Sequence, residues 1–383
     1  MIALQNGCYL TPDGKFTKGD VIIENSKLKL DHVSETLTNK EDCLDMEGLF
    51  VLPGLIDVHI HGAAGHDVMN STPGQIKEMA GFLARNGVTS FVPTTMTAAA
   101  QSIKAALGNI KKASEMDSIA ATIAGVHIEG PYINALQRGC HNPALIKPPD
   151  IEEFYSFRKI IGDDLKLRIT VAPEVEGAME YIKEVSVNGG SISLGHTDAD
   201  SKIILEAVKN GAVSFTHLFN AMKGLHHREP GTAGAALAGD SYVELICDGI
   251  HVHPDIINLV YKIKGTDKII LITDSIPAAG MGDGEYRFGG YKVLVSEGQA
   301  RNGNGALAGS TITLWQAVKN IMGFTGASLE AAVRMASINP ARLIGLDNIT
   351  GSIEEGKRAD LFAVNKNLDI VYVFCKGRMV YKK

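Results

Sequence analysis

Histidine is the residue type whose placement in this chain first suggests chemistry. Of the twelve histidines, all but His32 lie between His59 and His253. His59 and His61 end an apolar run, and alternate residues of a strand share one face, so both imidazoles can reach the same ion. Imidazole together with carboxylate is a donor set for zinc or another first-row divalent metal. The pair therefore indicates a metal site.

Other metal-competent side chains follow further apolar runs, each at the carboxyl end of a predicted strand. A single histidine in such a place is more often structural than a ligand, whereas a set of donors at successive strand ends favours a shared site. His66 stays unassigned, while His127 lies two residues before Glu129 and is expected to be an extra polar group near the metals. The complete set of donors is His59, His61, Glu129, His196, His217 and Asp274.

The elements that would bring these groups together are eight short apolar or β-branched runs, which alternate with segments of helical pattern such as 73–86 and 178–188. This alternation predicts a (β/α)8 barrel, whose catalytic groups lie at the carboxyl ends of the strands. A doubly wound sheet would normally place a glycine-rich loop after its first strand, where this chain has His59 and His61. The predicted strands are 51–58, 88–92, 122–128, 167–171, 191–194, 212–216, 242–247 and 268–272.

The two ends of the chain differ from this middle part, because each shows only short β-like runs separated by turns. Neither end has enough strands for an independent core. We therefore expect residues 1–52 and 350–383 to form one small β-sandwich domain, and residues 53–349 to form the metal-dependent barrel. Inside the barrel region, 284–309 predicts a glycine-rich hairpin insert, and 310–322 and 328–343 predict a helix pair.

The composition excludes several classes of protein. With 37 basic and 43 acidic residues the formal charge is −6, and no basic run stands out, which speaks against a nucleic-acid partner. No apolar run reaches the roughly 18 residues of a membrane span, and the start of the chain lacks a signal-peptide pattern. The five cysteines are scattered, which argues against disulfides and against a cysteine zinc site. We expect a cytoplasmic protein with no membrane partner.

A family resemblance becomes specific at these strand ends. The segment GLFVLPGLIDVHIHG at 48–62 resembles the entry signature of the metal-dependent amidohydrolase superfamily. Within it, the chain is most similar to the N-acetylglucosamine-6-phosphate deacetylase family, and the matching segments follow the family's order over nearly the whole chain. They are HIHGAAGHDVMN (59–70), GVHIEGPY (125–132), GCHNP (139–143), LGHTDA (194–199), THLFNAM (216–222), REPG (228–231), DGIHVHP (248–254) and ITDS (272–275).

The resemblance implies three principal metal ligands, Glu129, His196 and His217. His59 and His61 match the pair that holds a second ion in some members of the family, whereas other members lack the pair and work with one ion. One or two divalent ions per subunit are therefore expected, with Glu129 as the bridge between two. Zinc is favoured, and iron is the alternative.

The resemblance also implies a reaction, the hydrolysis of N-acetyl-D-glucosamine 6-phosphate to glucosamine 6-phosphate and acetate in amino-sugar catabolism and cell-wall sugar recycling. A bound metal lowers the pKa of water from 15.7 to about 7. Asp274 is expected to take a proton from the attacking water and to pass it to the sugar nitrogen. His141 is expected to hydrogen-bond the acetyl carbonyl and to support the developing oxyanion.

The same resemblance assigns the substrate contacts. Arg228 and His251 match the contacts to the 6-phosphate, and Arg228 would act across a subunit interface, which implies a homodimer. Residues Asn220 and Ala221 are expected to hold the phosphate or the sugar. The full set of expected substrate-binding residues is Cys140, Asn220, Ala221, Arg228, His251, Leu307 and Ala308.

Three other interpretations compete with this one. A dihydroorotase-like hydrolase usually has a bridging lysine at the end of the fourth strand, where this chain has 170–174 without lysine. A purine aminohydrolase is disfavoured by the Arg228 and His251 pair. A non-catalytic sugar-phosphate binder on the same barrel would have no need of Asp274 beside a full ligand set.

Overall fold

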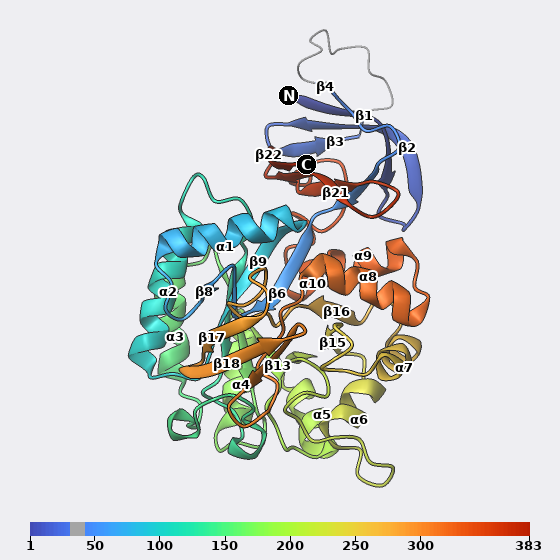
Figure 1. Ribbon diagram of the computed structural model, residues 1–383. Coiled ribbons are helices and arrows are strands. Elements are labelled where there is room, and N and C mark those ends of the chain that lie inside the picture. The colour runs from blue at the N-terminus through green and yellow to red at the C-terminus, as the bar shows by residue number, and fades with distance from the viewer. Residues whose placement is uncertain (31–42) are drawn as a thin grey trace.

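Parallel strands in the middle of the chain form a barrel (Figure 1). The computed structural model describes residues 1–30 and 43–383. Neighbouring strands are hydrogen-bonded around the ring, and a parallel bridge between Ile60 and Ser275 brings the first strand to the end of the eighth. The predicted (β/α)8 fold is confirmed. Its strands are β6 (Leu55–Ile60), β9 (Val88–Thr95), β11 (Gly125–Glu129), β12 (Lys166–Val171), β13 (Gly190–Leu194), β14 (Ala212–Phe215), β15 (Tyr242–Ile246) and β16 (Ile269–Ile272), with the short β10 (Thr122–Ile123) beside β9.

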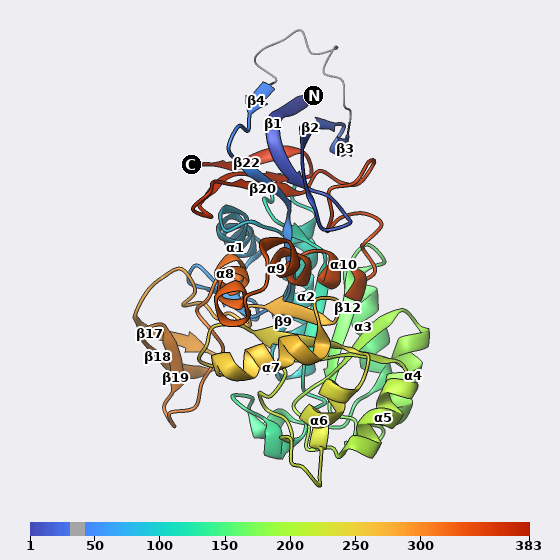
Figure 2. The ribbon, with the colours of Figure 1, turned by 90° about the vertical axis from the view of Figure 1, so that its right-hand side faces the viewer.

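Amphipathic helices cover the outside of this barrel (Figures 1 and 2). In α1, for example, Ile76, Met79, Ala80 and Leu83 are buried, which is the spacing of one apolar helix face. The Thr72 hydroxyl caps the start of that helix. The helices between the strands are α1 (Pro73–Arg85), α2 (Ala100–Ser114), α3 (Ile151–Ile161), α4 (Ala178–Val187), α5 (Ser201–Lys209), α6 (Gly231–Ala238) and α7 (Pro254–Lys264).

Three helices follow the eighth strand, α8 (Leu314–Thr325), α9 (Leu329–Ala336) and α10 (Ile338–Leu343). The prediction of one helix over 328–343 is therefore wrong. The backbone of Ser337 has φ −131° and ψ −80°, which is not helical. Pro340 follows three residues later and has no N–H to continue the hydrogen-bond ladder of the first helix.

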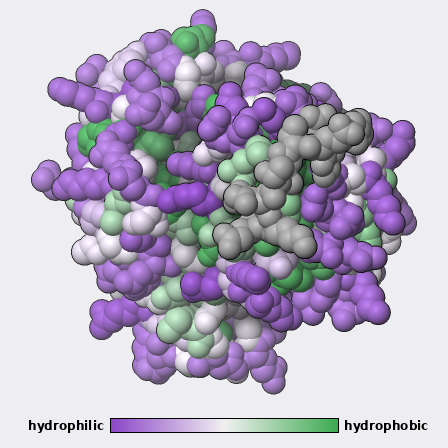
Figure 3. Space-filling model, turned by 90° about the horizontal axis from the view of Figure 1, so that it is seen from above, coloured by the Kyte–Doolittle hydropathy of each residue, from purple (hydrophilic) through white to green (hydrophobic). Residues whose placement is uncertain are grey.

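A separate sheet from both chain ends lies at one end of the barrel, as Figures 1 and 2 show. Its path is β22-β21-β20-β5-β1-β2-β3, and β4 pairs with β1. The predicted small β unit built from both termini is thus present, while the exact domain boundaries stay a prediction. From above, the face over this sheet is mostly hydrophilic (Figure 3). The strands are β1 (Ile2–Leu10), β2 (Phe16–Glu24), β3 (Lys27–Lys29), β4 (Cys43–Asp45), β5 (Phe50–Pro53), β20 (Leu361–Val364), β21 (Ile370–Cys375) and β22 (Arg378–Lys382).

The chain passes from this sheet into the barrel at Gly54. The expected single strand over 51–58 is in fact two strands, because β5 pairs antiparallel with β20 and β6 pairs parallel with β9. A Cβ atom at Gly54 would lie 2.0 Å from the Oγ1 atom of Thr89, so only glycine allows the chain to pass this close to β9.

The predicted insert after the eighth strand is a three-stranded antiparallel sheet, β17 (Gly284–Phe288), β18 (Tyr291–Ser296) and β19 (Gln299–Asn302). Its apolar side joins Met96, Ile276 and Ala308 in a small buried cluster. The ring of Phe288 lies 5.2 Å from that of His61, so this sheet covers the ends of the barrel strands. A two-stranded ribbon, β7 (Gly62–Ala63) and β8 (His66–Asp67), lies after β6. No helix of the described residues is long and apolar enough to cross a membrane.

Candidate metal centre and active site

The predicted metal-binding side chains all lie at the carboxyl ends of barrel strands. His59 and Glu129 belong to β6 and β11, while His196, His217 and Asp274 follow β13, β14 and β16 by two residues each. All five are at most 9% exposed. The last three have positive φ angles of 48°, 30° and 48°, a region that side chains other than glycine rarely adopt. Such local strain is typical of functional sites, where the surrounding structure maintains it.

Four histidine Nε2 atoms and the Glu129 carboxylate converge at one point. The Nε2 atoms of His59 and His61 are 3.2 Å apart, and those of His196 and His217 are 3.1 Å apart. The Oε1 atom of Glu129 lies 3.0 Å from Nε2 of His217, and its Oε2 atom lies 3.0 Å from Nε2 of His61. The carboxylate thus lies within 3.4 Å of the Nε2 atoms of all four histidines.

The hydrogen bonds on the far side of the imidazoles explain their orientation. Nδ1 of His196 donates to the carbonyl oxygen of Gln137 over 2.8 Å, and Nδ1 of His217 donates to that of Asn220 over 3.1 Å. Because Nδ1 of each ring carries a proton, the neutral forms point two Nε2 lone pairs at each other. Those lone pairs repel unless a positive charge lies beside them, so this donor set fits a divalent cation.

The charges in the cluster also favour a bound cation. Burial alone would raise the pKa of the Glu129 carboxyl, but the surrounding histidines hold it well below its usual range. Burial lowers the pKa of His61, yet the carboxylates of Asp274 and Glu129 raise it to about 9. This end of the barrel therefore attracts positive charge, and a metal ion competes with protons for the same nitrogen atoms.

His141 has the opposite arrangement of protons. Its Nδ1 atom accepts a hydrogen bond from the backbone N–H of Thr97 over 3.2 Å, so the proton of the neutral ring is on Nε2. That Nε2 atom lies 3.4 Å from Oε2 of Glu129, at the edge of the cluster. In its neutral form, His141 is therefore oriented to donate a hydrogen bond toward Glu129, while its ring also lies close enough to Glu129 and His196 to share an ion with them.

A cavity of about 150 Å³ opens onto this cluster. It is lined by five of the seven expected substrate-binding residues, namely Cys140, Asn220, Ala221, His251 and Leu307. In His251, Nδ1 lies 2.7 Å from the Asp248 carboxylate. Burial lowers the pKa of His251, but this carboxylate outweighs burial and raises the pKa, so the imidazole at the cavity keeps its positive charge to higher pH than an ordinary histidine.

The structure does not bring the other two expected residues to the cavity. Ala308 is buried, and it packs with Ile276 and Phe288 instead of lining the space. Arg228 is exposed in the loop before α6, where its Nη1 atom lies 2.8 Å from Nε2 of His227. Within its own chain, Arg228 lines a different surface depression, together with Lys202 and Lys223.

Several residues at the site were missed by sequence reasoning. Met96, Gly139, Phe288 and Gly309 also line the cavity. Glu244 and Arg168 form a fully buried ion pair behind His59. A charged residue inside an otherwise apolar strand, as in VELI (243–246) and LRIT (167–170), was the available signal for this pair.

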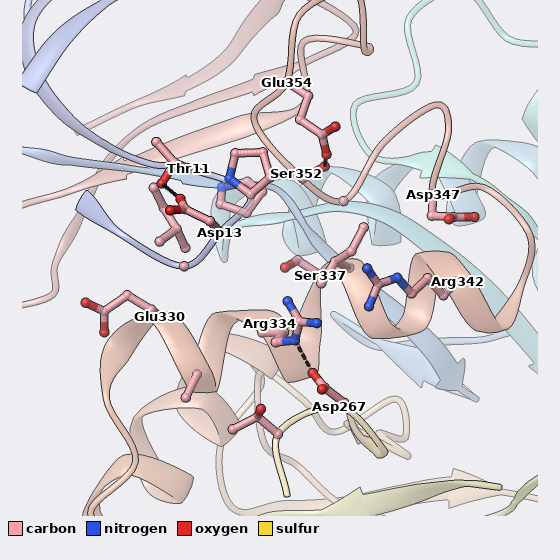
Figure 4. Close-up of a pocket in the computed structure, with 18 of the residues that line it drawn as sticks. Thr11, Asp13, Asp267, Glu330, Arg334, Ser337, Arg342, Asp347, Ser352 and Glu354 are labelled. Carbon is pink, nitrogen blue, oxygen red and sulfur yellow. Dashed lines mark hydrogen bonds and ion pairs between the residues drawn. The ribbon is translucent and has the colours of Figure 1, made fainter. Parts of the chain in front are cut away.

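A larger cleft of about 590 Å³ lies elsewhere, between the turn at 11–14 and helices α9 and α10 (Figure 4). Its arginine Arg334 is ion-paired with Asp267, and the guanidinium of Arg342 points toward the same space. None of the predicted site residues lines this cleft. We therefore place the chemistry in the smaller cavity, which contains the convergent donors.

A (β/α)8 barrel that gathers histidine and carboxylate donors at its strand ends is the architecture of a metal-dependent barrel enzyme. The chain belongs to the amidohydrolase family, whose model matches residues 50–380.

Known proteins of this family are similar over nearly the whole chain. The N-acetylglucosamine-6-phosphate deacetylase of Vibrio furnissii is 38% identical over 89% of this chain and 85% of its own. The N-acetylgalactosamine-6-phosphate deacetylase of Escherichia coli O157:H7 is 38% identical over 85% of this chain and 86% of its own. A solved structure of a variant N-acetyl-D-glucosamine-6-phosphate deacetylase from Mycobacterium smegmatis, in complex with N-acetyl-D-glucosamine-6-phosphate, is similar with a TM-score of 0.91 and 30% identity, over 100% of this chain and 99% of its own.

Proposed function

We propose that this protein hydrolyses the acetamide of N-acetyl-D-glucosamine 6-phosphate and releases glucosamine 6-phosphate and acetate. The observation that carries the proposal is that one cavity is lined by three kinds of group this reaction needs: metal donors, the Asp274 carboxylate and the His141 donor. The similarity to deacetylases of phosphorylated amino sugars supports this choice of substrate.

Glu129, His196 and His217 would hold the principal ion, and His59 and His61 a second one. The ion is a divalent metal, and we propose zinc because the set is dominated by imidazole nitrogen. When bound, such an ion polarises the acetyl carbonyl and lowers the pKa of water.

Asp274 would act as the base and then as the acid of the reaction. Burial raises the pKa of its carboxyl, but His59 and His61 lower it to about 2, so the group is ionised at neutral pH. It can then accept a proton from the attacking water and return that proton to the sugar nitrogen as the C–N bond breaks. His141 would donate its Nε2 proton to the carbonyl oxygen as negative charge develops there.

The phosphate would lie at the end of the cavity with His251, held also by Asn220. Arg228 lies away from the cavity of its own chain, so its expected contact with the phosphate requires a second copy of the chain. We therefore propose a homodimer in which Arg228 reaches into the partner's cavity. The scattered cysteines, of which Cys247 and Cys375 are buried in the core, support our expectation of a cytoplasmic location.

The test is acetate release by the purified protein from N-acetylglucosamine 6-phosphate, with the unphosphorylated sugar as control and metal analysis on the same sample. We expect rapid release from the phosphorylated sugar alone, and at least one divalent ion per chain. No acetate from either sugar would overturn the deacetylase proposal, and equal turnover of both sugars would overturn the phosphate pocket. N-Acetylgalactosamine 6-phosphate is the second candidate substrate, because the N-acetylgalactosamine-6-phosphate deacetylase of Escherichia coli O157:H7 is as similar to this chain as the Vibrio furnissii enzyme, at 38% identity.

A further inference from the structure

The buried ion pair of Arg168 and Glu244 links β12 to β15, two strands that are not neighbours in the barrel. Both side chains are at most 1% exposed. An Nη2 atom of Arg168 also donates to the hydroxyl of Ser214 over 2.9 Å, while its Nε and Nη1 atoms have no hydrogen-bond partner. Burying such a pair requires desolvation of two charges, and an apolar pair of similar volume is often at least as stable. The ion pair of Arg168 and Glu244 is therefore expected to have a role other than stabilising the fold.

The contact between Glu244 and His59 indicates what this role is. The Oε2 atom of Glu244 lies 3.1 Å from Nδ1 of His59, on the side of the ring opposite the metal-binding Nε2 atom. The other three ligand histidines, His61, His196 and His217, use backbone carbonyl oxygens in this place. Among the four, His59 alone depends on a side chain, and that side chain is ionic.

We propose that Glu244, fixed by Arg168, is the positioning residue that makes the His59 and His61 ion site tight, and so determines whether the protein works with two ions or with one. The inference rests on the proposed function, in that it concerns the second ion of that site. A carboxylate that accepts the Nδ1 proton fixes the tautomer of His59, orients its ring and makes Nε2 a stronger ligand. Arg168 keeps the carboxylate directed at the ring, because it holds the other oxygen, Oε1.

Removal of the Arg168 and Glu244 pair should weaken the binding of only one of the two ions. The Oε2 atom of Glu244 also accepts a long hydrogen bond of 3.4 Å from the backbone N–H of His217. The imidazoles of His196 and His217 are nevertheless oriented by backbone carbonyl oxygens, which no substitution removes. Loss of the pair should therefore weaken the second ion and leave the first in place.

The experiment counts zinc ions and measures their affinities in the purified full-length protein, by competition with a chelator and by elemental analysis. Replacing Glu244 alone leaves Arg168 buried without its counter-charge, so the informative variant is the double change Glu244→Leu with Arg168→Met, which replaces the pair by apolar side chains of similar size. We expect two ions in the natural protein. In the double variant we expect one tight ion and a second that binds roughly 10- to 100-fold more weakly.

Three comparisons make the result specific. His59→Leu removes the ligand itself and should give the same one-ion form. Arg168→Lys keeps a cation beside Glu244 and should retain the second ion. Glu153→Gln neutralises another buried carboxylate, which accepts from Tyr132 and Lys147 and lies away from the metal donors, so both ions should remain.

A double variant whose second ion binds within about threefold of the natural protein would overturn the proposal. So would equal loss of both ions, or a natural protein that takes up only one ion at saturating zinc. The metal count needs no substrate, so any of these results leaves the deacetylase proposal standing. Absence of acetate release from the two-ion protein would instead count against the deacetylase proposal alone.

Discussion

The backbone N–H of Thr97 donates to Nδ1 of His141, which also lies 2.7 Å from the hydroxyl oxygen of Thr97, and this hydrogen bonding distinguishes His141 from the histidines around it. The imidazoles of His196 and His217 carry their protons on Nδ1 and offer Nε2 lone pairs. His141 carries its proton on Nε2 and offers a donor to the cavity. One cluster of similar side chains thus presents both Nε2 lone pairs and an Nε2–H donor, and the difference is set by the group that each ring contacts through Nδ1.

The first prediction follows from this hydrogen bond. Replacing His141→Gln should lower kcat by roughly 10²- to 10³-fold, the effect of removing one donor to a developing oxyanion. KM should change little, because the donor acts mainly on the transition state. Steady-state acetate release measures both. Thr97→Val keeps the backbone N–H but removes the hydroxyl that lies 2.7 Å from Nδ1, so kcat should fall less than in His141→Gln. A His141→Gln variant with near-normal kcat would contradict the role.

Asp274→Asn should remove turnover but not the metal. The amide cannot accept a proton from water, so kcat should fall by roughly 10²- to 10⁴-fold, the usual contribution of general acid–base catalysis. The ligand nitrogens and Glu129 are unchanged, so elemental analysis should find the same ions as in the natural protein. If the variant lost its metal along with its activity, Asp274 would have to be counted as a ligand instead.

The affinity for phosphate should fall as the pH rises. The pKa of His251 is raised because the Asp248 carboxylate outweighs burial, so the imidazole is still positive at its ordinary pKa and loses its charge only as the pH rises through the raised value. KM should therefore increase over that range. In Asp248→Asn the increase should begin at lower pH, and in His251→Gln it should vanish.

The control for this titration is the substrate itself, whose phosphate has a second pKa of about 6. That ionisation is common to all three proteins, so only differences between their profiles report on His251. If the natural protein and His251→Gln had identical profiles of KM against pH, His251 would not be a phosphate contact.

Arg228→Gln should raise KM for the phosphorylated sugar and leave kcat largely unchanged. The guanidinium of Arg228 would bind phosphate equally in the ground state and the transition state, and such uniform binding affects KM alone. Lys202→Gln is the matched control, because it removes a cation from the same surface depression. Sedimentation should show a dimer for both variants. An unchanged KM, or a monomeric natural protein with full activity, would exclude a contact across subunits.

Gly54→Ala tests how the two sheets are joined. The added Cβ would lie 2.0 Å from Thr89, and such overpacking should lower the free energy of unfolding by about 1–3 kcal/mol. Gly108→Ala in α2 is the control, because its Cβ would meet nothing within 4 Å and helix propensity should raise stability by up to about 1 kcal/mol. Chemical denaturation measures both. Equal stabilities for the two variants would show that the chain relaxes around Gly54.

Much of the fold could be predicted because the strands of a parallel barrel are continuous apolar runs that repeat along the chain. The same property caused the error at 51–58. Residues on both sides of Gly54 are equally apolar and equally buried, so periodicity contains no sign that β5 and β6 join different sheets. The glycine after Pro53 was the only local signal. Ser337 likewise looks like an ordinary helical residue, and Pro340, which cannot continue the hydrogen-bond ladder of the preceding helix, was the local signal for the break.

The site was predictable to the extent that its residues end strands. His59, Glu129, His196, His217 and Asp274 could be collected in this way, and the resemblance assigned their expected roles. The left-handed backbone at three of them, and the choice of carbonyl or carboxylate behind each imidazole, depend on contacts between distant segments. Ala308 shows the limit, since its neighbours Leu307 and Gly309 line the cavity while its own side chain turns into the core.

The sheet built from both chain ends also has a consequence for biosynthesis. Translation delivers β1 to β5 first and β20 to β22 last, so the edge of β5 that pairs with β20 stays open while residues 54–360 are being made. An open strand edge readily pairs with another chain. A nascent or truncated polypeptide that lacks β20 therefore carries an exposed edge on β5, and this edge is covered only after β20 has been synthesised.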